Sequence, residues 1–229
     1  MMPLPALADT AGMTRAGLAM PEKIFVVRHG QSTWNSTRRV TGQLDPPLSA
    51  EGEAQAERLK KVLSGARLTA IYTSDLSRAV ATARPTAQAQ GLPIQQRAAL
   101  REQHLGVVQG RFRDERDAEA RALWSERDAR RLNFRIPGGE THAELEARVV
   151  ACLNEISHKE QGGCVLIVGH RNTNRVLLAA LLDWPADVAV QAKLRSHHLY
   201  EIAPLRLPLV QTISLREGET GSRREGFWQ

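Results

Sequence analysis

Two histidines follow apolar segments of the chain, each at the point where a strand is expected to end. Ile24–Val27 leads into Arg28 and His29, and Cys164–Val168 leads through a glycine into His170. Short runs of β-branched and apolar residues predict strands that are buried on both faces, as in a parallel sheet. Because parallel strands end at one edge of a sheet, where open α/β folds bind ligands, we expect both histidines at one site.

Cationic and amide side chains accompany the first histidine. Arg28 adjoins it and Asn35 follows shortly after, while Arg78 is expected in the first turn of a helix, where an anion is favoured. Arg78 could instead be a solvated surface charge, but its position before an apolar pair favours an inward orientation. Guanidinium groups bind phosphate oxygens in bidentate, charge-assisted pairs. These residue types, without metal-ligand spacing, predict a site for a phosphoryl group.

The chemistry expected of such a site is phosphoryl transfer. A neutral imidazole at His29 can take the phosphoryl group covalently, and His170 can stabilise the transition state. A carboxylic acid must then protonate the leaving oxygen, a contribution of about 10²–10⁴-fold in rate. Glu102 lies where the third sheet segment is expected to end, and is the candidate for this acid.

Alternating strand and helix patterns surround these residues. Helices are expected after the cap Ser49, after Ser74 or Asp75, from Thr141, and after His170 as far as Pro185. Further strands are expected at 68–73, 93–96, 198–203 and 207–213, with 93–96 and 207–213 resembling edge strands. The pattern predicts an α/β three-layer sandwich: a mostly parallel, doubly wound sheet flanked by helices, with a helical lid or insertion.

One principal domain is expected between residues 21 and 215, with its lid at about 101–137, where charged residues are dense. Residues 1–20 are interpreted as a flexible N-terminal extension rather than a signal peptide, and Met13 and Met20 leave the true translation start open. Residues 216–229 are interpreted as a polar, mobile C-terminal tail.

The amino-acid composition limits the classes of binding partner that are expected. No apolar run approaches the ~20 residues that span a bilayer, so no membrane association is expected. The net charge is +6, but aromatic residues make up only 4% and no basic tract carries interleaved rings, which argues against nucleic acid and for a small anionic substrate. Two cysteines make no disulfide framework, so a reducing cytoplasm is expected. The sequence allows a homodimer but does not determine the oligomeric state.

Several segments, in one order along the chain, resemble the histidine phosphatase superfamily, also called phosphoglycerate mutase-like. They are Arg28-His29-Gly30, Thr41-Gly42-Gln43 with Leu48-Ser49 and Gly52, Ser74-Asp75-Leu76-Ser77-Arg78-Ala79, Glu102 with Gly106 and Gln109-Gly110, Pro137-Gly138-Gly139-Glu140-Thr141, and Gly169-His170. The likeness spans about residues 23–182. It implies a metal-independent enzyme that needs no cofactor.

The resemblance also implies roles for single residues. His29 is implied to be the phosphohistidine nucleophile and Glu102 the proton donor. The residues implied to hold the phosphoryl group are Arg28, Asn35, Arg78 and His170. Thr41 and Gly42 are implied to line the substrate side of the site.

The sequence departs from the family pattern at two places. Arg171 stands where the family usually has glycine after its second histidine, and it could clamp the substrate or point to solvent. Gln103-His104-Leu105 stands where mutases read Arg-His-Tyr, and the proline-rich stretch after their paired arginine is missing, although Arg130-Arg131 lie at a similar distance. Residues 170–173 are nevertheless similar to the mutase form, which makes Asn172 a further candidate for substrate binding.

These features favour a metal-independent phosphatase that hydrolyses a phosphomonoester through a phosphohistidine. A phosphoglycerate mutase primed by a bisphosphate is the alternative enzyme. A phosphate-binding module without turnover is a third hypothesis, against which the intact His29, Glu102 and His170 argue. The charge of residues 101–137 suggests an anionic or multiply phosphorylated substrate, but does not identify it. His197 and His198 are interpreted as strand residues rather than metal ligands.

Overall fold

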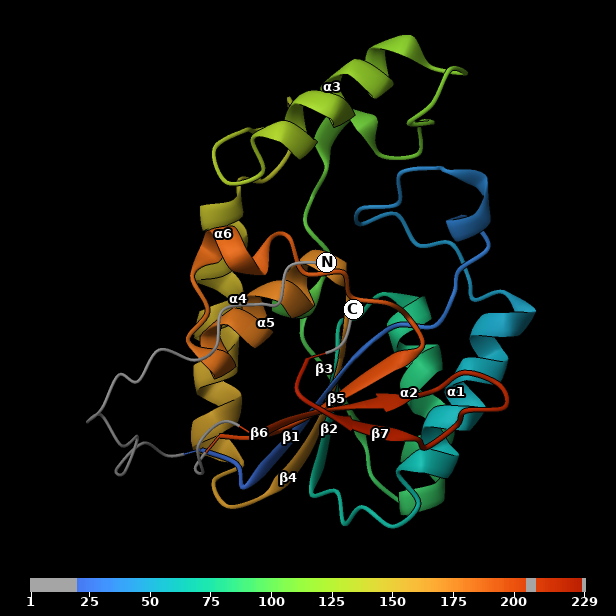
Figure 1. Ribbon diagram of the computed structural model, residues 1–229, viewed down its shortest axis with the longest axis vertical. Coiled ribbons are helices and arrows are strands. Elements are labelled where there is room, and N and C mark those ends of the chain that lie inside the picture. Colours follow the sequence, from blue (N-terminus) through green and yellow to red (C-terminus); the bar gives the residue numbers. More distant parts are fainter. Residues whose placement is uncertain (1–19, 205–208, 228–229) are drawn as a thin grey trace.

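The structure is a computed structural model that describes residues 20–204 and 209–227, and its centre is a sheet in the order β3-β2-β4-β1-β5-β6-β7 (Figure 1). The strands are β1 (Lys23–Arg28), β2 (Ala70–Thr73), β3 (Ile94–Gln96), β4 (Cys164–Gly169), β5 (His198–Ala203), β6 (Leu209–Ser214) and β7 (Arg223–Glu225). The helices are α1 (Ala50–Val62), α2 (Ser77–Gln90), α3 (Ala118–Ala129), α4 (His142–Lys159), α5 (Arg171–Leu182) and α6 (Ala186–Ala189). Single 3₁₀ turns lie at Asn35–Thr37, Ala98–Leu100 and Gly106–Val108.

The sheet combines a parallel half with an antiparallel half. Strands β3, β2, β4 and β1 are parallel to one another, while β5, β6 and β7 continue the sheet in antiparallel pairing. In the register of β1 with β4, Arg28 lies beside Gly169. The residues that follow, His29 and His170, therefore leave the sheet side by side, as the sequence predicted.

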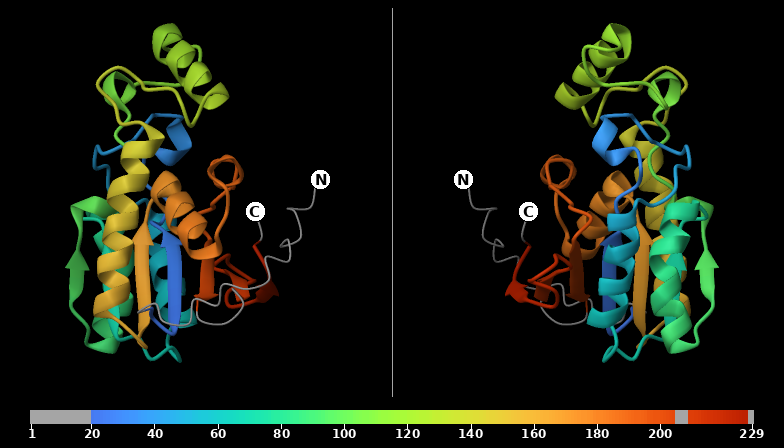
Figure 2. Two further views of the ribbon diagram at one scale, coloured as in Figure 1. Left: turned by 90° about the vertical axis from the view of Figure 1, so that its left-hand side faces the viewer. Right: turned by 90° about the vertical axis from the view of Figure 1, so that its right-hand side faces the viewer.

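Alternate residues of the central strands face two separate helical layers. Ile24 and Val26 of β1 belong to the apolar cluster under α4 and α5, whereas Phe25 and Val27 belong to the cluster under α1 and α2. Figure 2 shows the helices on both faces of the sheet. Because the side chains of a strand alternate between faces, a continuous apolar run fills both layers. The predicted three-layer α/β architecture is confirmed.

The cap of α2 differs from the prediction. The helix begins at Ser77, and its N-cap is Leu76, which has no capping side chain. Ser74 instead contacts His170, and the Asp75 carboxylate accepts a hydrogen bond from Arg101 at 2.6 Å. Both polar side chains therefore bind residues in or near the site and do not cap the helix. Ser49 caps α1 as predicted, and the helix predicted from Thr141 begins at His142, with Thr141 as its N-cap in a capping box.

The segment after residue 215 extends the sheet instead of forming a mobile tail. β7 pairs with β6, so the sheet edge is β7 and not the strand predicted at 207–213, whose residues 207–208 lie outside the described residues. Phe227 then stacks on Tyr200 with ring centroids 4.8 Å apart. The predicted extension 1–20 also lies outside the described residues, apart from Met20.

Helix α3 stands apart from the three layers, beyond the carboxyl ends of the parallel strands (Figure 1). It rests on a small third apolar cluster, which consists of Val40, Leu105, Val108, Ala120 and Ile136 with the partly buried Leu123, Trp124 and Phe134. This segment occupies the region predicted as a lid. Within the described ranges, no helix has the length and hydropathy that a membrane span requires.

Candidate active site

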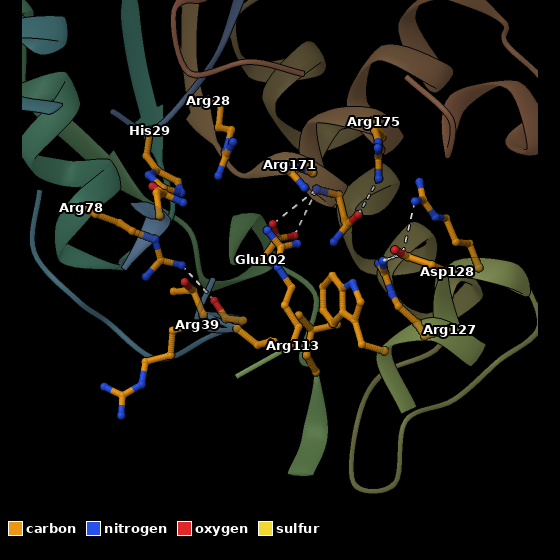
Figure 3. A pocket seen from close by; sticks show the side chains of 18 residues that line it. Arg28, His29, Arg39, Arg78, Glu102, Arg113, Arg127, Asp128, Arg171 and Arg175 are labelled. Atoms are coloured by element: carbon orange, nitrogen blue, oxygen red, sulfur yellow. Dashed lines mark hydrogen bonds and ion pairs between the residues drawn. The ribbon is translucent and has the colours of Figure 1, made fainter. Parts of the chain in front are cut away.

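A cavity opens at the carboxyl ends of β1 and β4, under α3 (Figure 3). Its charged lining consists of eight arginines, Arg28, Arg39, Arg78, Arg113, Arg127, Arg131, Arg171 and Arg175, with two carboxylates, Glu102 and Asp128. The predicted residues His29, Asn35, Thr41, Gly42 and Asn172 also line it. His170 lies directly behind His29, with ring centroids 5.0 Å apart. The structure thus brings every predicted site residue together.

His29 is held in one tautomer. Its Nδ1 lies 2.7 Å from the carbonyl oxygen of Gly30, and a carbonyl only accepts hydrogen bonds, so Nδ1 carries the proton. Burial of the ring, which is 4% exposed, and the nearby Arg28 and Arg78 hold its pKa well below 6.5. The imidazole is therefore neutral, and the lone pair of Nε2 is the one available for reaction.

Gly30 is needed for the close packing behind this histidine. A Cβ atom on Gly30 would lie 2.6 Å from the carbonyl oxygen of Gly52, in the first turn of α1. The Gly30 amide also donates to Thr82 Oγ1 at 2.9 Å. Backbone contacts to two helices therefore fix the carbonyl that orients His29.

His170 has its own fixed orientation at the N-cap of α5. Its Nε2 lies 2.7 Å from Ser74 Oγ, and its Nδ1 lies 3.4 Å from Nη2 of Arg78. A guanidinium only donates, so Nδ1 accepts and Nε2–H donates to Ser74. Burial, followed by the charge of Arg78, keeps the His170 pKa well below 6.5.

Arg78 points inward from α2 and is 1% exposed, so the surface-charge alternative was wrong. Its Nη2 donates to the carbonyl of Gly42 at 2.9 Å, and its Nη1 donates to that of Leu44 at 2.6 Å. Asp45 lies 3.4 Å from Nη1 and provides partial charge balance. The loop that contains Thr41 and Gly42 is therefore tied directly to the guanidinium.

Arg28 faces the cavity with its charge unbalanced. Within the described part of the chain, no hydrogen bond or ion pair engages its guanidinium, and its Nε is buried without a partner. Burial, followed by the charge of Arg171, lowers the pKa of Arg28 to about 9. Asn35 uses its Oδ1 to accept from the Ser32 amide at 2.7 Å, which leaves its NH₂ group as the donor for a ligand.

Glu102 is placed by backbone amides. Its Oε1 accepts from its neighbour Gln103 N at 2.9 Å and from Asn172 N at 3.1 Å, in the first turn of α5. The side chain of Asn172 turns the other way, and its Oδ1 accepts from Arg175 Nη1 at 3.0 Å. Asn172 therefore contributes its amide to the carboxylate and its side chain to the arginine.

Arg148 of α4 organises the loop that carries Glu102, a role that the sequence did not reveal. It donates to the carbonyls of Ala99 at 2.6 Å, Arg101 at 3.0 Å and Glu102 at 3.1 Å. It also forms a bidentate pair with Glu140, at 2.6 Å and 2.9 Å. The Pro137–Thr141 segment noted in the sequence therefore acts by holding the Glu102 loop.

Other cavity residues were also missed. These are Arg39, Val40, Leu105, Arg113, Trp124, Arg127, Asp128 and Arg175. The dense charge of residues 101–137 indicated their presence, but not which side chains face inward. Of the pair Arg130-Arg131, noted in the sequence at a distance similar to that in mutases, Arg131 lines the cavity, while Arg130 is 58% exposed and pairs with Glu126. Among the described residues, no cluster of three His, Cys, Asp or Glu side chains has a metal-binding arrangement.

Comparison with known proteins identifies the wider family. The model of the histidine phosphatase superfamily (branch 1) matches residues 24–205. A relative described as a probable phosphoglycerate mutase, GpmB, from Salmonella choleraesuis (strain SC-B67) is 36% identical over 174 residues, which cover 76% of this chain and 81% of the relative.

Solved structures give the same architecture. Bacillus stearothermophilus YhfR is 31% identical with a TM-score of 0.72, over 79% of this chain and 90% of that one. The α-ribazole phosphatase of Shigella flexneri is 25% identical with a TM-score of 0.71, over 79% and 89%. A mycobacterial glucosyl-3-phosphoglycerate phosphatase is 29% identical with a TM-score of 0.70, over 90% and 98%.

Proposed function

Since the chain belongs to the histidine phosphatase superfamily, we propose that it is a metal-independent phosphatase that hydrolyses a small phosphomonoester through a phosphohistidine at His29. The observation that carries the proposal is the state of His29. Its Nδ1 proton is held by the Gly30 carbonyl, and its Nε2 lone pair belongs to a neutral ring beside an arginine-lined cavity. A nucleophile with this environment is suited to an anionic phosphorus centre.

In the first step, the Nε2 lone pair of His29 forms a bond to phosphorus while the bond from phosphorus to the leaving oxygen breaks. Arg28 and Arg78, with the Asn35 amide, stabilise the charge on the three remaining oxygens, and His170 orients Arg78 through its Nδ1. Glu102, when protonated, gives its proton to the leaving oxygen, so that a neutral alcohol departs.

In the second step, a water molecule attacks the phosphorus of phosphohistidine and the N–P bond breaks. The Glu102 carboxylate accepts a proton from that water, which restores the acid and releases phosphate. The backbone amides of Gln103 and Asn172 keep the carboxylate in place for both transfers.

The test is hydrolysis of p-nitrophenyl phosphate in EDTA by the wild type, His29→Ala and His158→Ala. His158 is an exposed histidine in the last turn of α4 and serves as the control. We expect loss of roughly 10⁴-fold or more in kcat/KM for His29→Ala, because removal of a nucleophile has effects of this size. His158→Ala should match the wild type. Equal activity of His29→Ala and wild type would refute the proposal.

The mutase alternative is supported by the curated relative described as a probable phosphoglycerate mutase. It predicts interconversion of 3- and 2-phosphoglycerate that depends on added 2,3-bisphosphoglycerate. Phosphate release without interconversion would decide for the phosphatase. Interconversion that is faster than phosphate release would decide for the mutase.

Two expectations about the setting of the enzyme remain proposals. We propose a reducing cytoplasm, which is consistent with free thiols at both Cys152 and Cys164. We also propose that the chain forms a homodimer, and sedimentation at several protein concentrations would test it.

A further inference from the structure

A second group of arginines lines the cavity beyond the reaction centre. We call Arg113, Arg127, Arg131, Arg171 and Arg175 the outer arginines. Three of them come from the lid and two from α5. In Figure 3, Arg127 and Arg175 lie across Glu102 from His29 and Arg78.

The outer arginines have too little negative charge around them. Asp128 is the acidic partner on their side of the cavity, 3.1 Å from Arg127 and 3.2 Å from Arg131. The guanidinium groups of Arg113 and Arg171 make no hydrogen bond or ion pair with any residue that the structure describes. The Arg113 guanidinium lies over the Trp124 ring at 5.4 Å, so neither of these two cations is paired with a carboxylate or a hydrogen-bond acceptor among the described residues.

Two of the outer arginines are also largely removed from water. Arg127 and Arg175 are each 6% exposed, and Nε of Arg127 is buried without a hydrogen-bond partner. Burial and the charges of Arg131 and Arg171 lower the pKa of Arg175 to about 9. Like charges gathered in this way repel one another, and a bound anion would remove that repulsion.

Contacts within the protein already hold Arg127 and Arg175 in fixed orientations. Arg175 donates its Nε to the carbonyl of Ala192 at 2.8 Å, and Arg127 lies over the Trp124 ring at 5.2 Å. Arg127 also donates to Gln103 Oε1 at 2.9 Å. Restraint before binding reduces the side-chain entropy that an anion complex loses.

A single phosphoryl group at His29 cannot contact the arginines on both sides of Glu102. The group transferred to His29 meets Arg28 and Arg78, while Arg127 and Arg175 lie on the other side of Glu102 (Figure 3). We propose that Arg113 and Arg171, supported by Arg127 and Arg175, form a second anion subsite for a carboxylate or second phosphate of the same substrate molecule. This inference rests on the proposed function, which places the first phosphoryl group at His29.

Matched pairs of substrates test the subsite. Glycerol 3-phosphate and 3-phosphoglycerate differ by a carboxylate, and fructose 6-phosphate and fructose 1,6-bisphosphate differ by a phosphate. We expect kcat/KM for phosphate release to be at least tenfold higher for the doubly anionic member of one pair, and that pair identifies the second anion. Arg113→Met should reduce this ratio toward one, and Arg113→Lys should keep part of it.

Arg130→Met is the matched control, because Arg130 is an exposed arginine at the end of α3 that does not line the cavity. It should leave the ratio unchanged. A wild-type ratio of one in both pairs would overturn the subsite. Equal losses for both members of a pair in Arg113→Met would also overturn it.

Binding to His29→Ala separates failure of the subsite from failure of the proposed function. Calorimetry should show at least tenfold tighter binding of the doubly anionic member, and Arg113→Met in that background should abolish the difference. If the wild type hydrolyses no ester but this preference is seen, the phosphatase proposal fails and the subsite stands. Equal affinity for both members would overturn the subsite whether or not hydrolysis occurs.

Discussion

The reaction centre and the outer arginines share one cavity but are built in different ways. Around His29, side chains are fixed by the backbone: Nδ1 of His29 donates to Gly30, and Arg78 donates to the carbonyls of Gly42 and Leu44. Among the outer arginines, Arg113 and Arg171 have no polar partner among the described residues, and Arg113 is exposed. Among the described residues, the reaction centre has one unpaired cation, Arg28, beside side chains that the backbone holds, whereas the outer arginines include two, Arg113 and Arg171.

The origin of each region explains the difference. The residues around His29 lie at the ends of buried parallel strands and in the first turns of the helices that follow, where sheet pairing fixes the backbone. Arg113 and Arg127 lie on a lid that rests on a small apolar cluster. Chemistry requires atoms held within fractions of an ångström, whereas substrate selection tolerates adaptable contacts. The reaction centre therefore lies on elements anchored by the sheet, whereas three of the five outer arginines lie in the segment around α3 and two, Arg171 and Arg175, lie on α5.

Replacement of Glu102 tests the reaction centre most strongly. Glu102→Gln keeps the hydrogen-bonding shape but removes the acid, so hydrolysis of alkyl phosphates should fall by about 10²–10⁴-fold in kcat. p-Nitrophenyl phosphate, whose leaving group needs little protonation, should lose far less. Steady-state kinetics on both esters will check this. Equal losses on the two esters would exclude Glu102 as the proton donor.

Arg148→Met should cause the next largest decrease in kcat, although Arg148 does not line the cavity. Loss of its bonds to the carbonyls of Ala99, Arg101 and Glu102 frees the loop, and misplacement of about 1 Å can cost roughly 10²-fold in rate. As a positioning residue, it should affect kcat more than KM and alkyl esters more than aryl esters.

A control variant and a double variant distinguish the misplacement of Glu102 in Arg148→Met from a general loss of stability. Arg223→Met removes an ion pair with Glu201 at the β7 edge of the sheet and should leave kcat unchanged. In a Glu102→Gln background, Arg148→Met should add little further loss on alkyl esters. Full additivity of the two changes would show that Arg148 acts independently of Glu102.

The smallest expected effect concerns the pH dependence of stability. Burial and nearby arginines lower the pKa of His29 and His170 in the folded protein. At pH values between the folded-state pKa and the unfolded value near 6.5, only the unfolded chain binds a proton at these two histidines. The free energy of unfolding should therefore be highest above pH 6.5 and fall below it, by at most about 1.4 kcal/mol per pH unit for each histidine.

Urea unfolding at pH 7.5, 6.5 and 5.5 will measure that slope. His170→Gln should make the slope shallower, whereas His158→Gln, which changes an exposed histidine, should retain it. An unchanged slope in His170→Gln would contradict the assignment of His170 as a neutral buried group. At the outer arginines, which stay charged across this pH range, no comparable dependence is expected.

Much of the reaction centre could be predicted from local patterns. The two apolar runs specified buried strands, and the residues directly after them had to meet at one sheet edge. Capping by Ser49 and Thr141 was equally local, because side chain and amide lie three residues apart. Ser74 and Asp75 were misassigned because their partners, His170 and Arg101, lie 96 and 26 residues away along the chain.

Local sequence patterns determined the chemical character of this protein: they indicated strand-end histidines, an arginine in the first turn of a helix, and a lid segment rich in charge. Which arginines enter the cavity was decided only in the folded molecule. Arg127 and Arg130 are three residues apart, yet one is buried and the other exposed. The way α3 packs on the cluster of Val40, Leu105 and Ile136 sets that choice. Such packing depends on segments distant in the chain, so the identity of the inward arginines is a property of the tertiary structure.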